Sequence, residues 1–240
     1  MSFLINPYAF GFKGTVYEDD FSGTAGVSLN GRSPNVVNMT GNTYTTQFGN
    51  FQLDGNGRLW LVGSGTGTGW ARIALPSGQS GSVIVTEIIL RPKNLDSTRG
   101  NWIGVGLSTD SDTGMGDTAS GGVAWALLRG HTSNAAGKIE IYSGYGTVDS
   151  LYATGAGSEA GFQGNNPSTL KLTYTVSTGN LKVELGGIEK FNGLIAFGGT
   201  ADTPAPISAL SHLMFNFNLT GRSGDGIHAA YVDYLKVSFL

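Results

Sequence analysis

Three aspartates in one glycine-containing segment are the first residues whose spacing suggests chemistry. Asp110, Asp112 and Asp117 lie in STDSDTGMGD, residues 108–117, and carboxylates on a short loop supply the hard oxygen ligands that Ca²⁺ prefers. The spacing departs from an EF-hand, because Met115 and Gly121 stand where that loop carries its glycine and its bidentate glutamate. A solvated loop with Asx-type turns is the alternative. We therefore assign no metal site and no cofactor, and leave calcium binding by these aspartates open.

Paired carboxylates that could cleave a glycosidic bond are missing from the sequence pattern. Glycoside hydrolysis commonly uses two, held a set distance apart across the substrate. Glu87 stands alone in VTEIIL and Glu140 alone in KIEIY, and a single glutamate on an alternating strand usually faces solvent. Glu184 and Glu189 are separated by LGGI, with no aspartate between them. We therefore predict that the chain is not an enzyme.

The three histidines, His131, His212 and His228, do not lie at metal-ligand spacing, and no Gly-x-Ser-x-Gly elbow occurs. A Ser/His/Asp triad needs its members to meet only in space, so the sequence neither favours nor excludes one. Each histidine is interpreted as a turn or strand-end residue.

The tryptophans are the candidates for ligand binding, because an aromatic ring can stack on the apolar face of a sugar. Trp60 and Trp125 lie within apolar runs, which favours the core. Trp70 follows GSGTGTG and Trp102 follows RGN, so both stand at loop edges and are the predicted ligand-binding residues. A tryptophan that starts a strand also commonly packs beneath its loop, and that alternative stays open.

Short strands must position these residues. Period-two alternation or enrichment in β-branched and aromatic residues, bounded by Gly, Asn, Ser or Pro, predicts ten strands. They cover residues 58–63, 70–75, 82–92, 101–108, 122–130, 137–144, 169–176, 180–187, 212–220 and 229–240. Residues 177–180 predict a hairpin turn, with Gly179 free to take a positive φ. Many strands without a helical period predict one all-β domain of two stacked antiparallel sheets, a jelly-roll-like sandwich.

The composition excludes several classes of protein. The chain has 240 residues, of which 39 are glycine and 13% are charged, with a net charge of −3 and no cysteine. It lacks the clustered basic face that nucleic acid requires, and it contains no disulfide and no thiolate metal site. No window approaches the ~18 apolar residues of a membrane span. We expect neither a nucleic-acid nor a membrane partner.

The first residues, MSFLINPYAFGF, do not have the pattern of a signal peptide. The first basic residue is Lys13, after the apolar run, and Asn6 and Pro7 interrupt that run. We expect an apolar arm over residues 1–15 that docks on a neighbouring subunit, or that covers its own sandwich, followed by a single domain over residues 16–240.

Two segments carry a resemblance to a known fold family. YEDDFSGTAGVSLNGRSPNV, residues 17–36, resembles the opening of concanavalin A-like lectin/glucanase sandwiches, and YVDYLKVSF, residues 231–239, resembles their terminal strand. The resemblance implies a concanavalin A-like sandwich with a possible carbohydrate ligand. Glucanases of this fold carry two Glu flanking an Asp on one strand, and this chain has no such cluster.

The N-terminus carries a second resemblance. MSFLINPYAFG is similar to the start of tailed-bacteriophage virion proteins, which implies a non-enzymatic capsid decoration, tail or receptor-binding protein located in the virion. The expected partners are other virion proteins, copies of the same chain with a trimer favoured, and host or environmental glycans. A stand-alone carbohydrate-binding module is the alternative, and a glycoside hydrolase is the third hypothesis.

Overall fold

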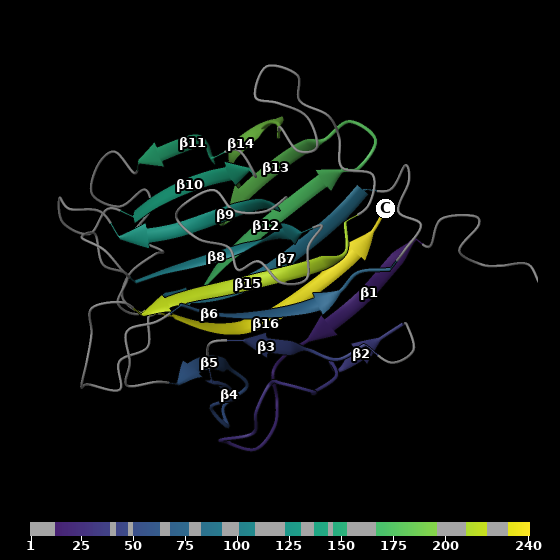
Figure 1. Ribbon diagram of the computed structural model, residues 1–240, viewed down its shortest axis with the longest axis vertical. Helices are drawn as coiled ribbons and strands as arrows, with labels where there is room; N and C mark the ends of the chain where they lie inside the picture. The colour runs from purple at the N-terminus through teal and green to yellow at the C-terminus, as the bar shows by residue number, and fades with distance from the viewer. Residues whose placement is uncertain are drawn as a thin grey trace, which may run out of the picture.

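The protein is seen in a computed structural model that describes residues 13–38, 42–47, 50–62, 68–76, 83–92, 101–108, 123–130, 137–143, 146–152, 167–195, 210–219 and 230–240. These residues form sixteen strands and no helix, arranged as two antiparallel sheets that lie one in front of the other (Figure 1). The prediction of an all-β, two-sheet sandwich of jelly-roll type is therefore confirmed.

The nine-stranded sheet has the order β14-β13-β12-β7-β16-β1-β2, and β5 adds to β16 with β4 at its side. Its strands are β1 (Gly14–Asp19), β2 (Val36–Val37), β4 (Asn50–Leu53), β5 (Leu59–Val62), β7 (Val83–Pro92), β12 (Ser168–Thr175), β13 (Asn180–Leu185), β14 (Ile188–Leu194) and β16 (Ala230–Phe239).

The seven-stranded sheet has the order β11-β10-β9-β8-β15-β6-β3. Its strands are β3 (Thr45–Gln47), β6 (Thr68–Ala74), β8 (Asn101–Ser108), β9 (Val123–Gly130), β10 (Gly137–Ser143), β11 (Gly146–Tyr152) and β15 (His212–Leu219). The ten predicted strands are all present. The six further strands are short or lie where the sequence shows no clear alternation.

The core lies between the sheets and is supplied by alternate residues of each strand. In β15, Leu213, Phe215 and Phe217 point inward, and Phe215 makes edge-to-face contacts with Phe51 and Tyr44. Full burial of such a side chain contributes about 1.5–3 kcal/mol. The same alternation turns the even-numbered residues of β15 to the outer face of the sheet, where the candidate site lies.

The hairpin predicted at residues 177–180 is confirmed. It joins β12 to β13, and Thr175 is opposite Asn180 in the register. The backbone N–H of Gly179 donates to the carbonyl of Thr175 at 2.9 Å, and Gly179 has a φ of 71°. That φ favours glycine because the left-handed region carries no steric penalty without a Cβ.

The first strand begins at Gly14, so residues 14 and 15 of the expected arm belong to β1. Residues 1–12 lie outside the described part of the chain. A β-bulge between Thr15 and Tyr17 leaves Val16 unpaired, and both Val16 and Tyr17 are buried as a result. Among the described residues, no helix is long and apolar enough to span a membrane.

Candidate functional site

The candidate site is the outer face of the seven-stranded sheet, the face turned away from the sandwich core. The strand register places two neighbouring rows of side chains across five strands here. The first row, from β6 to β10, is Arg72, Met214, Gly106, Trp125 and Tyr142. The second is Trp70, Asn216, Gly104, Leu127 and Glu140.

A buried aromatic cluster forms the floor of this face. Its members are Trp70, Trp125, Leu127, Tyr142 and Met214, each no more than 3% exposed. The rings of Trp125 and Tyr142 are stacked, with centroids 5.1 Å apart and planes at 7°. They can stack because they are directly opposite each other on β9 and β10, where cross-strand aromatic pairs meet.

Gly106 allows β8 and β9 to come close together beneath this cluster. A Cβ at Gly106 would lie 2.4 Å from the carbonyl oxygen of Ala124 and 2.4 Å from Cβ of Trp125. Backbone atoms cannot move aside as a flexible side chain can, so any larger residue here would displace β9. Gly106 therefore fixes the position from which the Trp125 indole extends over the sheet.

Polar groups accompany the aromatic floor. The hydroxyl of Tyr142 donates to Oε2 of Glu140 at 3.1 Å, and Glu140 is 5% exposed. The two side chains meet because residues two apart on a strand share a face. The Arg72 guanidinium lies over the Trp70 ring, 4.8 Å from its centroid.

Arg72 and His212 are partly exposed polar groups among the side chains described on this face, and Thr45 and Gln47 of β3, opposite Arg72 and Trp70, are exposed. His212 is paired with Ala74, two residues along β6 from Arg72. Nδ1 of His212 lies 2.7 Å from Oγ of Ser211, which in turn donates to the carbonyl of Ser108 at 3.1 Å. A partly exposed guanidinium and imidazole beside this buried cluster can hydrogen-bond the hydroxyl groups of a ligand.

Carboxylates are the groups that glycoside hydrolysis would need on this face. Among the side chains that the structure describes here, Glu140 is the single carboxylate, whereas glycoside hydrolysis commonly needs a pair. The next residue on the same face of β10 is Tyr142, which carries no carboxylate. The described geometry can bind and orient a ligand.

The structure describes the two predicted site residues, Trp70 and Trp102, to different extents. Trp70 lies inside β6 and its side chain is 2% exposed, so it is part of the aromatic floor and is not an open platform at a loop edge. The backbone of Trp102 is in β8, opposite Arg129 and Asn218; its side chain is outside the described atoms. Sugar stacking by either residue stays a prediction.

Two interpretations of single residues were wrong. Trp60, expected in the core, is only partly buried and points away from it. Glu140, expected on a solvated face, is buried beside Tyr142. Glu87 fits the solvated interpretation, since its side chain is 38% exposed and lies 3.3 Å from Nζ of Lys171.

Several candidate ligands and catalytic residues cannot be placed. Asp110, Asp112 and Asp117 lie outside the described residues, as do His131 and His228. Within the described ranges, no group of three or more His, Asp or Glu side chains could hold a metal ion. Calcium binding by the three aspartates therefore stays an open prediction.

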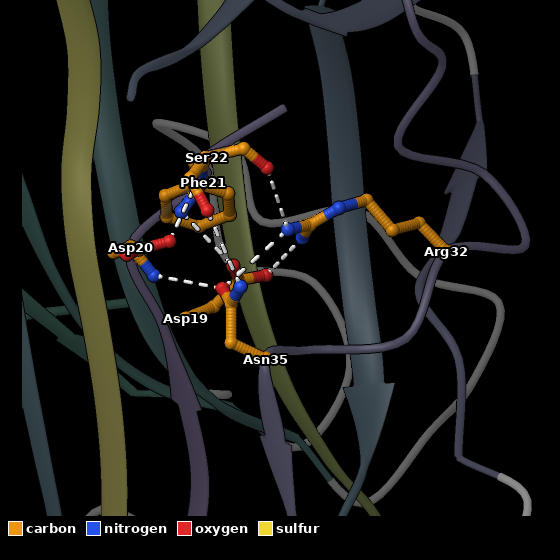
Figure 2. Close-up of polar contacts among 6 residues, drawn as sticks. All are labelled: Asp19, Asp20, Phe21, Ser22, Arg32 and Asn35. Atoms are coloured by element: carbon orange, nitrogen blue, oxygen red, sulfur yellow. Dashed lines mark hydrogen bonds and ion pairs between the residues drawn. The ribbon is translucent and has the colours of Figure 1, made fainter. Parts of the chain in front are cut away.

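A second polar cluster joins the end of β1 to the loop that follows it (Figure 2). Asp19 is fully buried, and its Oδ2 forms an ion pair with the guanidinium of Arg32, which is 16% exposed. The second carboxylate oxygen, Oδ1, accepts the backbone N–H of Phe21 at 2.9 Å. Phe21 has a φ of 51°, a conformation that is uncommon for a bulky residue and needs such support.

Arg32 and Asn35 close this cluster. The second nitrogen of the Arg32 guanidinium donates to the carbonyl of Ser22 at 3.3 Å and to Oδ1 of Asn35 at 3.5 Å. The same Asn35 oxygen accepts the backbone N–H of Asp20 at 3.1 Å. Each of these donors is used within the loop, so the cluster holds the chain in place and does not present open groups to a ligand.

The Asp19 carboxylate also acts on a neighbouring phenol. Burial, and next the negative charge of Asp19, hold the pKa of Tyr44 well above its ordinary value of 10.0. The sequence analysis did not predict the ion pair of Asp19 with Arg32, although both residues lie in the segment that resembles concanavalin A-like sandwiches. No local pattern indicated this contact, because Asp19 and Arg32 are thirteen residues apart and meet through the path of the loop.

The comparisons with known proteins bear on the fold. No family model matches the chain, and no curated protein matches its sequence. Solved structures do match it. The endo-1,3-β-glucanase of Streptomyces sioyaensis matches with a TM-score of 0.61 and 17% identity, over 94% of this chain and 96% of that chain.

Two carbohydrate-binding proteins are also similar. The carbohydrate recognition domain of Emp46p, in its metal-free form, has a TM-score of 0.56 and 14% identity over 89% of this chain and 96% of its own. Lectin UEA-II, complexed with galactose, has a TM-score of 0.56 and 13% identity over 93% and 97%. At these identities the likeness establishes architecture alone. The chain has the concanavalin A-like lectin/glucanase fold.

Proposed function

We propose that the chain is a non-enzymatic, glycan-binding adhesion or structural component of a phage virion. The glycan contacts the partly exposed side chains of Arg72 and His212 on the outer face of the seven-stranded sheet, beside the buried cluster that contains Trp70, Trp125 and Tyr142. A stand-alone carbohydrate-binding module is the alternative setting for the same activity.

The main support for a glycan ligand is that partly exposed hydrogen-bonding side chains, Arg72 and His212, lie beside a buried aromatic cluster. Arg72 is held over Trp70 at 4.8 Å from the ring centroid, so its planar guanidinium is fixed in orientation. A fixed guanidinium loses less side-chain entropy when it binds. Sites for small ligands typically combine apolar and aromatic lining with a few placed polar groups.

The fold adds support of a weaker kind, because a fold hosts many functions. The similar solved structures include a carbohydrate recognition domain, a lectin complexed with galactose and an endo-1,3-β-glucanase. Carbohydrate is the ligand class that these names share. The single described carboxylate, Glu140, favours binding over hydrolysis for this chain.

The virion setting is supported by the sequence. The N-terminal MSFLINPYAFGF resembles the start of phage virion proteins and is apolar and uncharged. Burial of its large side chains on a neighbouring subunit would contribute about 1.5–3 kcal/mol each, enough to hold an oligomer together. The proposed state is a homo-oligomer, with a trimer favoured, assembled in the host cytoplasm with other virion proteins.

Binding is tested by isothermal titration of the full chain with laminarihexaose, a β-1,3-linked glucose hexamer, and with galactose. Arg72→Ala and His212→Ala should each lower the affinity about tenfold, because each variant loses about one hydrogen bond between a charged or polar side chain and the glycan. Lys171→Ala, on the outer face of the other sheet, is the control and should bind as the parent does. No heat of binding with either sugar, or equal affinity in all variants, refutes the proposed site.

Hydrolysis is tested in the same preparations by the release of reducing ends from the hexamer. We expect none. Release that disappears in Glu140→Gln would establish a glycosidase and overturn the non-enzymatic proposal.

Assembly is tested by light scattering behind a sizing column, on the full chain and on a variant lacking residues 1–13. That deletion ends just before β1 begins at Gly14. A trimer or larger assembly that becomes a monomer in the variant supports the virion proposal. A monomer in both cases favours a stand-alone module.

A further inference from the structure

A second aromatic surface lies on the outer face of the nine-stranded sheet. Trp60 of β5 and Tyr231 of β16 are direct cross-strand partners, and their rings lie 6.1 Å apart with planes at 13°. Leu59 and Leu61 point into the core, so alternation turns Trp60 outward. Both rings are partly exposed, unlike Trp70 and Trp125, whose rings are buried.

A charged group flanks the aromatic pair on one side. The Arg58 guanidinium lies over the Tyr231 ring, 5.6 Å from the ring centroid, and its Nε lies 3.8 Å from Oδ1 of Asp233. Asp233 is the extra residue of a β-bulge between Val232 and Tyr234. Bulges redirect side chains, and this one brings the carboxylate beside the guanidinium.

The turn before β5 fixes Arg58 in place. Oδ1 of Asp54 accepts the backbone N–H groups of Asn56 at 2.7 Å and of Arg58 at 3.1 Å. Gly57 in this turn has a φ of 74°, which favours glycine. The position of Arg58 therefore follows from the turn itself and does not depend on a bound ligand.

We infer that Trp60 and Tyr231, with Arg58 and Asp233 beside them, form a second carbohydrate subsite that takes a neutral β-linked pyranose. This inference rests on the proposed glycan-binding function and extends it to the opposite face of the sandwich. One face of a β-glucopyranose ring presents only axial C–H groups, which carry partial positive charge. These meet the negative face of an aromatic ring favourably.

The charges of the subsite decide which sugar it takes. Arg58 lies between two carboxylates, at 3.8 Å from Asp233 and 4.0 Å from Asp54. Among the described side chains, one guanidinium and two carboxylates give this cluster a net negative charge, which disfavours a sialic acid or another anionic sugar. The Asp233 carboxylate is 19% exposed and can accept hydrogen bonds from neighbouring sugar hydroxyls.

A purely structural role for the pair makes a different prediction. Cross-strand aromatic pairs stabilise a sheet, and here Trp60 and Tyr231 join the short β5 to β16. If that were their only role, truncation of Trp60 would lower stability and leave the stoichiometry and affinity of glycan binding unchanged.

The test uses the full chain labelled with 5-fluorotryptophan, titrated with laminarihexaose and followed by fluorine NMR and calorimetry. The chain has four tryptophans, and the Trp60 signal is assigned as the one lost in Trp60→Phe. We expect the Trp60 signal to shift on titration. We expect Trp60→Ala to lower the affinity of one binding event about tenfold, and Trp60→Phe to lower it less.

Tyr234→Ala is the matched control. Tyr234 is a partly exposed aromatic residue on the same strand and the same face, outside the aromatic pair. Its removal should leave binding unchanged. Sialyllactose serves as the anionic probe and should not shift the Trp60 signal; a shift as large as that with laminarihexaose would overturn the neutral-sugar assignment.

The outcomes separate this inference from the proposed function. Binding that falls in Trp60→Ala but not in Arg72→Ala supports the subsite and refutes the site on the seven-stranded sheet. Binding that falls in Arg72→Ala, with an unmoved Trp60 signal, overturns the subsite and leaves the proposed function intact. Two binding events, one lost in Arg72→Ala and the other in Trp60→Ala, support both the proposed site and the subsite. The absence of any binding overturns both sites.

Discussion

The buried pair of Asp19 and Arg32 predicts a large and unequal response to substitution. Arg32→Met keeps most of the side-chain length but leaves the fully buried Asp19 carboxylate without its counter-charge. Removal of one partner from a buried ion pair costs about 3–5 kcal/mol. Arg32 retains 16% exposure, so we expect the lower end of that range, about 3 kcal/mol.

The reverse substitution should cost less. Asp19→Asn keeps an Oδ1 that can accept the Phe21 N–H, now 2.9 Å away, and it leaves a guanidinium that can reach water. The double variant Asp19→Asn/Arg32→Met should recover part of the loss seen in Arg32→Met, because it leaves no buried charge behind.

The assay is equilibrium unfolding in urea, with the free energy of unfolding obtained by linear extrapolation. A loss of about 3 kcal/mol corresponds to a fall in Tm of about 6 °C for a chain of this length. The control is Arg58→Met, whose partners lie at 3.8 and 4.0 Å and whose side chain is 32% exposed; it should cost less than about 1 kcal/mol. If Arg32→Met costs no more than Arg58→Met, the reasoning about a buried uncompensated charge is wrong.

Three further predictions concern stability and titration. Burial, and next a hydrogen bond to Glu18, raise the pKa of Tyr234 to about 12. The contribution of the protonated phenol to the free energy of unfolding is therefore present below pH 10 and is lost as the pH rises toward 12. Absorbance at alkaline pH should show this tyrosine ionising late, and ionisation near pH 10 in the folded protein would contradict the prediction. Gly106→Ala should destabilise the fold by about 1–3 kcal/mol, because its Cβ would meet backbone atoms at 2.4 Å, whereas Gly193→Ala, whose Cβ meets only the Phe191 ring at 3.0 Å, should cost clearly less in the same urea assay. The Thr86 hydroxyl is buried and has no hydrogen-bond partner within the described part of the chain, so Thr86→Val should leave the Tm unchanged or raise it, and a marked fall would reveal a partner.

The strands were predictable from the sequence because period-two alternation is a local property. Residues 169–176 alternate without exception, and β12 has Leu170, Leu172 and Tyr174 in the core. The turn at Gly179 was predictable for the same reason, since a positive φ is a requirement of the turn itself.

The two faces of each strand were harder to interpret. Alternation shows which residues share a face, but it does not show what covers that face. Trp70 and Glu140 alternate away from the core and would be expected to meet solvent, yet both are buried. Trp60 sits between Leu59 and Leu61, so the run is apolar throughout and its alternation is hidden.

Pairs that meet only in space were beyond local patterns. Asp19 and Arg32 are thirteen residues apart, and their contact depends on the path of the loop after β1. Trp60 and Tyr231 come from opposite ends of the chain and meet because β5 adds to the edge of β16. Spacing along the sequence carries no signal for either contact.

The central place of β16 has a consequence for synthesis of the protein. β16 pairs with β1, β5 and β7, so each of these three strands of the nine-stranded sheet lacks one of its partner strands until residues 230–239 leave the ribosome. The nine-stranded sheet must therefore close after residues 1–229 have been translated, by contacts of long sequence separation, which form slowly. During that interval the unpaired edges of β1 and β7 are exposed to other nascent chains, and the yield of folded protein should depend on how well the host cell shields them.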